Sequence, residues 1–169
     1  MKTPVLLTIL TLTINSCAPA SNTKGSASGN DTAEKGSVSL PENKSVDAEY
    51  QNRLLATKKF YPFDQWREHY QHGLMQYTNE NCNKVRTIFD ELIDALIVLG
   101  PHGGELQKKQ LFQKAILKIN QLNNTIGDLI ETGEREELCE LTNQITIACG
   151  LNPKQYGDGE GLASEWREW

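Results

Sequence analysis

The chain has 169 residues, of which 38% are hydrophobic and 23% are charged, and its formal net charge is −5. Residues 126–169 hold ten acids against three bases, a net charge of −7, whereas residues 51–125 hold ten bases against seven acids. The acidic C-terminal third lacks the basic stripes that bind nucleic acid, so nucleic acid is not an expected partner. It is typical either of a solvated acidic face or of a surface for a basic protein.

The first residues carry a targeting pattern. A single early lysine precedes an apolar run from Val5 to Ile14. This run is too short to span a bilayer, which needs roughly 20 residues, but it has the length of the apolar region of a signal peptide. We therefore expect residues 1–16 to be a signal peptide and the protein to be exported.

The four residues Ile14, Asn15, Ser16 and Cys17 resemble the bacterial lipobox, in which the cysteine is lipidated on sulfur and becomes the new N-terminus. The resemblance implies lipid attachment at Cys17, palmitate-type acylation and a membrane-bound protein of the cell envelope. Because Ala18 follows the cysteine, it also implies the outer membrane, with the domain in the periplasm. The alternative is an ordinary secretory signal cleaved near this point.

Residues 17–46 are rich in Ser, Gly, Asn, Thr and Lys and contain few large apolar side chains. Such a segment cannot bury enough surface to offset its conformational entropy. We expect a disordered linker that holds a domain, residues 47–169, away from the membrane.

The start of this domain predicts one or two short helices. Asp47 is a candidate N-cap for the first, which Pro62 would stop, and Asp64 is a candidate N-cap for the second. The second helix would carry an aromatic and aliphatic stripe on one face, which is typical of a core: Trp66, Tyr70, Leu74 and Tyr77.

Three longer helices follow. Apolar residues recur at spacings of three and four from Glu80 to Leu99 and again from Glu105 to Asn123. A third helix is predicted after Thr132, a candidate N-cap, with glutamates in its first turn and an end at Gly150. Only residues 126–130 suggest a short extended piece. The predicted fold is all-α, a small bundle of three main helices plus one or two short N-terminal helices.

The pattern predicts no metal site and no cofactor. His69 and His72 are three residues apart and could share a metal ion, but no third ligand lies nearby. No nucleophile–base pair or nucleotide fingerprint is recognisable, so neither catalytic residues nor a small-molecule substrate are expected. An enzyme using the two histidines and an acid would need a cleft that gathers them.

Besides Cys17 the chain has Cys82, Cys139 and Cys149. If the three main helices run up, down and up, Cys82 is level with Cys139, and these two form the candidate disulfide. The alternative is three buried free thiols.

Residues 128–169 contain "IETGEREELC", a helix that ends in glycine, and a terminal "EWREW". This segment resembles a family of small, uncharacterised bacterial helical proteins, and the resemblance covers roughly residues 82–169. Because no activity is established for that family, the resemblance implies a helical fold without implying a reaction.

The last residues have two interpretations. Ser164 could cap a final helical turn that places Trp166 and Trp169 on one side, where their rings would close the apolar edge of the bundle. Alternatively, these rings and the neighbouring carboxylates contact a partner. The candidate partner-binding residues are Glu165, Trp166, Glu168 and Trp169.

These features favour a non-enzymatic envelope lipoprotein that presents an acidic helical domain to a protein partner. One form of this hypothesis is an immunity-type protein that binds a basic toxin, with charge steering the encounter and aromatic rings as anchors. The alternative is a structural or assembly lipoprotein that packs against a larger envelope complex.

Overall fold

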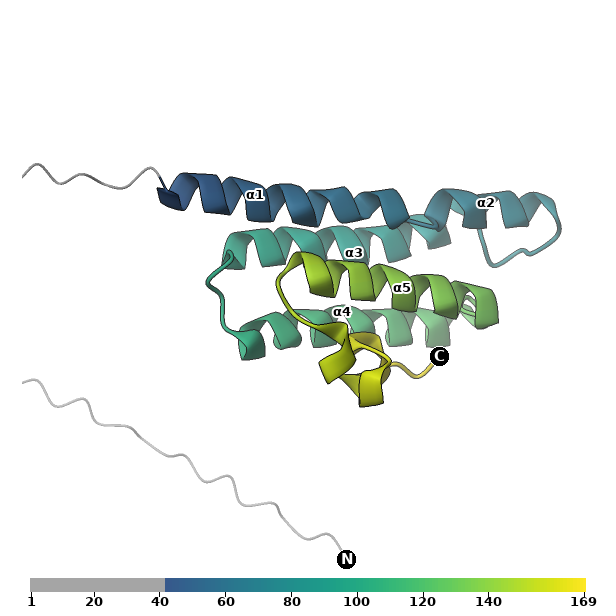
Figure 1. Cartoon of the computed structure of the whole chain (residues 1–169). Coiled ribbons are helices and arrows are strands. Elements are labelled where there is room, and N and C mark those ends of the chain that lie inside the picture. Colours follow the sequence, from purple (N-terminus) through teal and green to yellow (C-terminus); the bar gives the residue numbers. More distant parts are fainter. Residues whose placement is uncertain (1–41) are drawn as a thin grey trace, which may run out of the picture. The chain divides into compact units, whose positions relative to one another are not determined.

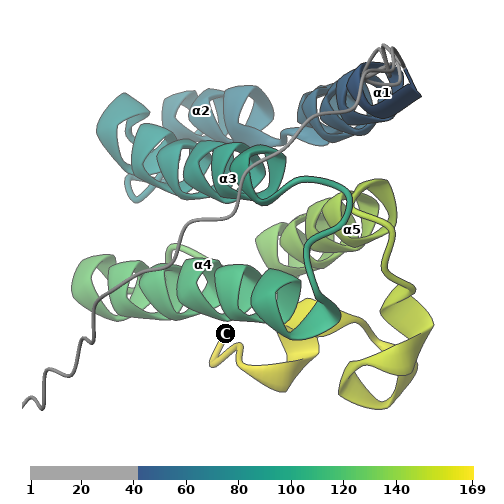
Figure 2. The same ribbon diagram turned by 90° about the vertical axis from the view of Figure 1, so that its left-hand side faces the viewer.

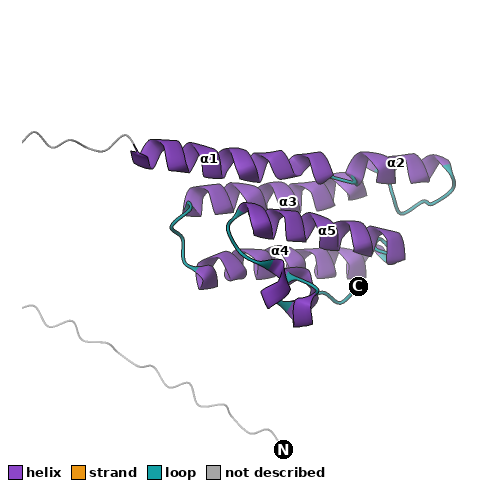
Figure 3. Ribbon diagram, in the orientation of Figure 1, coloured by secondary structure: helices purple, strands orange, loops and turns teal. Residues whose placement is uncertain are grey.

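The computed structural model describes residues 42–169 (Figure 1). The predicted signal peptide, Cys17 and most of the predicted linker lie outside this range. The described residues form only helices and connecting turns (Figure 3), which confirms the predicted all-α class. The elements are α1 (Glu42–Ala56), η1 (Thr57–Phe60), α2 (Phe63–Gln71), α3 (Asn79–Leu99), α4 (Glu105–Ile126), α5 (Thr132–Ala148), η2 (Pro153–Gln155), η3 (Gly157–Gly159) and η4 (Leu162–Glu165).

The three long helices begin and end close to the predicted positions. Thr78 caps α3 by accepting a hydrogen bond from the backbone of Asn81 at 3.1 Å. Gly100 ends α3 with φ +78, a conformation that suits glycine. Glu131 rather than Thr132 caps α5, and the Glu134 side chain accepts a hydrogen bond from the Glu131 backbone at 3.3 Å.

The N-terminal prediction was less accurate. α1 begins at Glu42, so the predicted domain boundary at Asp47 falls inside a helix. Residues 44–49 are all exposed, and an exposed polar turn leaves no apolar periodicity to detect. Pro62 rather than Asp64 occupies the N-cap of α2.

The predicted stripe on α2 is also partly wrong. The helix ends at Gln71, and Gly73 with φ +93 turns the chain away. Trp66 is buried as predicted, but Tyr70 and Leu74 are each 41% exposed. Tyr77 is buried, although it contributes from the loop before α3 and not from α2.

The helices pack around one core. α3 and α4 form an antiparallel hairpin, and α1, η1 and α2 follow one another along α3 and α5 (Figures 1 and 2). The C-terminal turn η4 packs against both α4 and α5. The largest fully buried side chains come from every α-helix except α5, from the loop before α3 and from the loop before α5: Tyr50, Leu54, Phe63, Trp66, Tyr77, Phe89, Ile93, Leu96, Phe112, Ile116, Ile119 and Leu129.

The predicted extended piece at residues 126–130 is not a strand, and residues 42–169 contain no strand. It is a turn in which Asp128 has φ +50 and the side chains of Leu129 and Ile130 are buried. Within residues 42–169, no helix combines the length and apolarity needed to cross a bilayer.

Candidate interaction site

Residues 160–169, which we call the C-terminal block, are held by the chain's own contacts. Trp166 and Trp169 are half-buried and pack against the core. Asn120 on α4 donates to the carbonyl oxygen of Trp166 at 2.8 Å and accepts from the backbone N–H of Glu168 at 3.2 Å. The carboxylate of Glu165 forms an ion pair with Lys109 at 3.1 Å. Of the four candidate partner-binding residues, Glu165 and Glu168 are exposed, and of these two only Glu165 forms an ion pair.

Arg167 completes this arrangement. Its guanidinium pairs with Glu160 at 3.1 Å and lies 6.0 Å from the ring centroid of Trp169. Ser164 does not cap a helical turn as predicted, because Gly161 occupies the N-cap of η4. The hydroxyl of Ser164 instead donates to Glu160 and accepts from Arg167. The block therefore uses its charges to fasten the chain end onto the bundle.

The candidate disulfide is not formed: Cys82, Cys139 and Cys149 are free thiols. Cys82 is fully buried, whereas Cys139 is half-buried. The two thiols thus lie in different surroundings, although their helices run as predicted. Burial raises the pKa of both thiols above the ordinary value.

The two histidines lie in different surroundings. His69 Nδ1 lies 3.7 Å from Glu134 Oε1, whereas His72 lies at the end of α2 and is exposed. No group of three metal-ligating side chains occurs within residues 42–169. Glu134 is only 7% exposed and also accepts a hydrogen bond at the start of α5. His69 therefore contacts a residue that belongs to the packing of α2 against α5.

A second contact joins α2 to α5. The indole nitrogen of the buried Trp66 donates to Glu137 Oε2 at 2.5 Å. A buried indole N–H requires an acceptor, and a charged acceptor forms a strong hydrogen bond. Glu137 is thus held by a buried side chain, whereas Glu136 and Glu140 are exposed.

A groove opens beside these glutamates, between α5 and the η1–α2 connection, with a volume of about 420 Å³. We call it the acidic groove. One side carries the rings of Phe60 and Tyr61, which we call the aromatic wall, and the other side carries three carboxylates. The lining residues are Lys59, Phe60, Tyr61, Pro62, Gln65, Glu136, Glu137 and Glu140.

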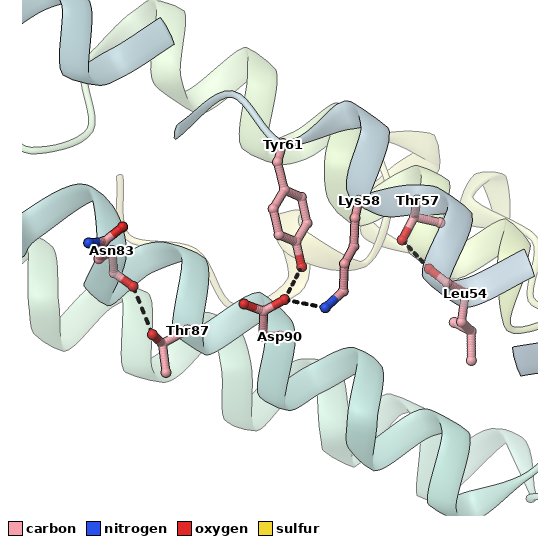
Figure 4. A network of polar contacts seen from close by, with 7 residues as sticks. All are labelled: Leu54, Thr57, Lys58, Tyr61, Asn83, Thr87 and Asp90. Atoms are coloured by element: carbon pink, nitrogen blue, oxygen red, sulfur yellow. Dashed lines mark hydrogen bonds and ion pairs between the residues drawn. The ribbon is translucent and has the colours of Figure 1, made fainter. Parts of the chain in front are cut away.

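Tyr61 of the aromatic wall is held in place by a hydrogen bond to α3. The hydroxyl of Tyr61 donates to Asp90 on α3 at 3.1 Å, and the ammonium of Lys58 pairs with the same carboxylate at 2.6 Å (Figure 4). Burial, with the nearby Asp90, raises the pKa of Tyr61 above its usual range, so the phenol remains a neutral donor. The wall is thus held in place by α3, and its position does not depend on a bound partner.

The carboxylates of the groove carry unbalanced charge. Among the described residues, no lysine or arginine forms an ion pair with Glu136, Glu137 or Glu140. Lys59 is the only base in the lining, and its ammonium lies 4.9 Å from the ring centroid of Phe60. Three carboxylates against one ammonium leave the groove with a net charge of −2.

A second, larger groove of about 610 Å³ runs between α3 and α4. We call it the apolar groove after two aliphatic side chains in its lining. Its apolar lining comes from Ile88 and Leu122, and its lysines, Lys84 and Lys118, form ion pairs with Glu80 and Glu91. The two grooves therefore differ in chemistry.

Sequence reasoning missed the acidic groove. The glutamates near the start of α5 were interpreted as favourable charges in the first turn of a helix. The available signal was the aromatic run at residues 60–63 and the excess of acids over bases at residues 131–140, but nothing in the sequence places these segments together. Comparison of the chain with family models, curated proteins and solved structures found no match.

Proposed function

We propose that this protein is a non-enzymatic lipoprotein of the bacterial cell envelope that presents its helical domain to a basic protein partner. The lipobox-like residues ending in Cys17 support the anchor, and the acidic groove supports the partner. The observation that carries the proposal is the set of three carboxylates, Glu136, Glu137 and Glu140, without an ion-pair partner in residues 42–169.

Unpaired carboxylates on a folded surface repel one another and do little for stability, whereas they attract a basic protein from solution. Such charges raise the association rate and select against acidic proteins. Aromatic rings beside them supply the apolar contact that concentrates binding energy in few residues. An immunity-type protein that neutralises a basic toxin is one form of this function.

The anchor and the interaction require separate tests. For the anchor, the protein and its Cys17→Ala variant are fractionated and their intact masses compared. The proposal expects a lipid-sized mass and membrane residence that the substitution abolishes. Unmodified, water-soluble protein in both cases would reject the anchor but leave the interaction open.

For the interaction, the protein is used to capture binding proteins from envelope extract at low salt. We expect a basic protein that is released at high salt and lost with the Glu136→Gln, Glu140→Gln double variant. Recovery that is unaffected by salt and by the double variant would contradict the proposal.

A second candidate is a structural or assembly lipoprotein, which the apolar groove favours. Leu117 and Leu106, 47% and 69% exposed, lie on α4 outside the core. This candidate expects the protein to migrate within a larger envelope complex, which Ile88→Asp would disperse and Glu140→Gln would leave intact.

A further inference from the structure

We propose that the acidic groove receives an arginine side chain of the partner, with its guanidinium between the aromatic wall and the carboxylates of Glu136 and Glu140. The inference rests on the proposed function and specifies the chemistry of the group that is recognised.

The charge of the groove restricts the class of ligand. An anion would be repelled by the net charge of −2 of the groove. An apolar side chain would remove water from the three carboxylates without supplying hydrogen bonds in its place. The three carboxylates do not converge on one point as metal ligands would, since no group of three metal-ligating side chains occurs in residues 42–169. An organic cation satisfies both sides of the groove, because it pairs with carboxylates and is attracted to ring faces.

The aromatic run beside the groove already contacts two cations of the chain itself. Lys59 lies 4.9 Å from the ring centroid of Phe60, and the guanidinium of Arg86 lies 5.6 Å and 5.5 Å from those of Tyr61 and Phe63. Arg86 therefore shows the proposed geometry on the same segment, with Asp64 as its carboxylate at 2.7 Å. Phe60 is the ring that stays accessible, with 38% of its surface exposed.

The carboxylates are placed for a forked donor. Glu137 is held by the indole of Trp66, and one oxygen of Glu140 accepts from Gln144 at 2.7 Å, which leaves its second oxygen available. Glu136 and Glu140 are four residues apart, so they lie on neighbouring turns of one face of α5. A guanidinium carries five donors in a planar fork and can stack on a ring while bonding at its edge, whereas the ammonium of lysine cannot.

The test uses the full-length protein in detergent and two labelled peptides, acetyl-(Arg-Gly)3-amide and the same peptide with lysine, followed by fluorescence anisotropy at low salt. We expect the arginine peptide to bind at least fivefold more tightly. Glu136→Gln with Glu140→Gln should weaken it at least tenfold, and Phe60→Ala should remove the preference over lysine. The matched control, Asp158→Asn with Glu168→Gln, makes the same charge change on exposed side chains outside the groove and should change binding less than twofold.

The outcomes separate the inference from the proposed function. Equal weakening by both charge pairs would show nonspecific attraction, which overturns the arginine site and leaves an acidic module. Equal affinity for the two peptides, still dependent on Glu136 and Glu140, would overturn the assignment of arginine. Failure of either peptide to bind the unaltered protein would contradict the proposed function itself. Circular dichroism melts check that each variant folds.

Discussion

The C-terminal block, residues 160–169, and the first half of α5, residues 131–140, are both acidic, but they use their acids differently. In the C-terminal block, Glu160 and Glu165 pair with Arg167 and Lys109. In the first half of α5, no glutamate pairs with a lysine or an arginine of the described chain. Acidity alone therefore does not identify a binding surface. Apart from Glu168, the glutamates of the C-terminal block are paired within the fold, whereas those of residues 131–140 have no lysine or arginine partner in residues 42–169.

The comparison predicts that the C-terminal block is part of the folded structure. Leu162 is fully buried, and we expect Leu162→Ala to lower the free energy of unfolding by about 3 kcal/mol, because it removes apolar contacts and leaves a cavity. Urea unfolding measures the change. The control is Leu106→Ala on an exposed side chain, for which we expect less than about 0.5 kcal/mol. A similar small effect for Leu162→Ala would mean that the block is not docked.

The hydrogen bonds of Asn120 sharpen the same comparison. Asn120→Ala removes the partners of the Trp166 carbonyl and the Glu168 N–H, so we expect a loss of about 2 kcal/mol. Asn124→Ala on an exposed position of the same helix serves as the control. Equal stability of the two variants would show that the chain end is free to leave the bundle, and the four candidate partner-binding residues would again be open to a partner.

Cys149, directly after α5, should make the stability of the fold depend on pH in the alkaline range. Burial, offset in part by Lys108, raises the pKa of Cys149 to about 11 from an ordinary value of 9. The folded state therefore holds this proton more tightly than the unfolded state, so its contribution is complete below pH 9 and is lost as the pH rises through 11. When the pH is raised from 8 to 10.5, the free energy of unfolding should fall in both proteins, and we expect this fall to be about 1–2 kcal/mol smaller in Cys149→Ala. Identical losses would show that this thiol does not titrate with unfolding.

The smallest predicted effects are those of neutralising one glutamate in each region, which should change stability in opposite directions. Glu165→Gln removes an ion pair with Lys109 and should lower stability by about 0.5 kcal/mol. Glu140→Gln removes repulsion from Glu136, four residues earlier, and should raise stability by about 0.3 kcal/mol. Thermal melts of the two variants in parallel measure the difference. Two losses of equal size would remove the distinction between paired and unpaired acids.

The parts of the fold that could be predicted are those with a local signal. The apolar period defines α3, α4 and α5 to within a few residues, whereas the predicted cap of α5, Thr132, is off by one position. Residues 44–49 of α1 lack this signal because they are exposed. The break after Gln71 depends on a single glycine, which is a weak signal within an otherwise regular apolar spacing.

The candidate site could not be predicted because it is made by tertiary packing. Phe60 and Glu136 are far apart in sequence and meet only because η1 packs against α5. The roles of the terminal tryptophans were left open for the same reason, since no local pattern shows that Asn120 binds the backbone on both sides of Arg167. Residue types indicate which chemistry is available, whereas the fold decides which charges remain unpaired.

The most direct test of the central claim is site-specific photo-crosslinking in cells. A photoreactive amino acid is placed at Gln65, an exposed position in the lining of the acidic groove, or at Glu168, an exposed position in the C-terminal block. The account predicts a crosslink to a basic protein from position 65, lost with Glu136→Gln and Glu140→Gln, and no such crosslink from position 168. A crosslink from position 168 alone would contradict it and return the function to the C-terminal block.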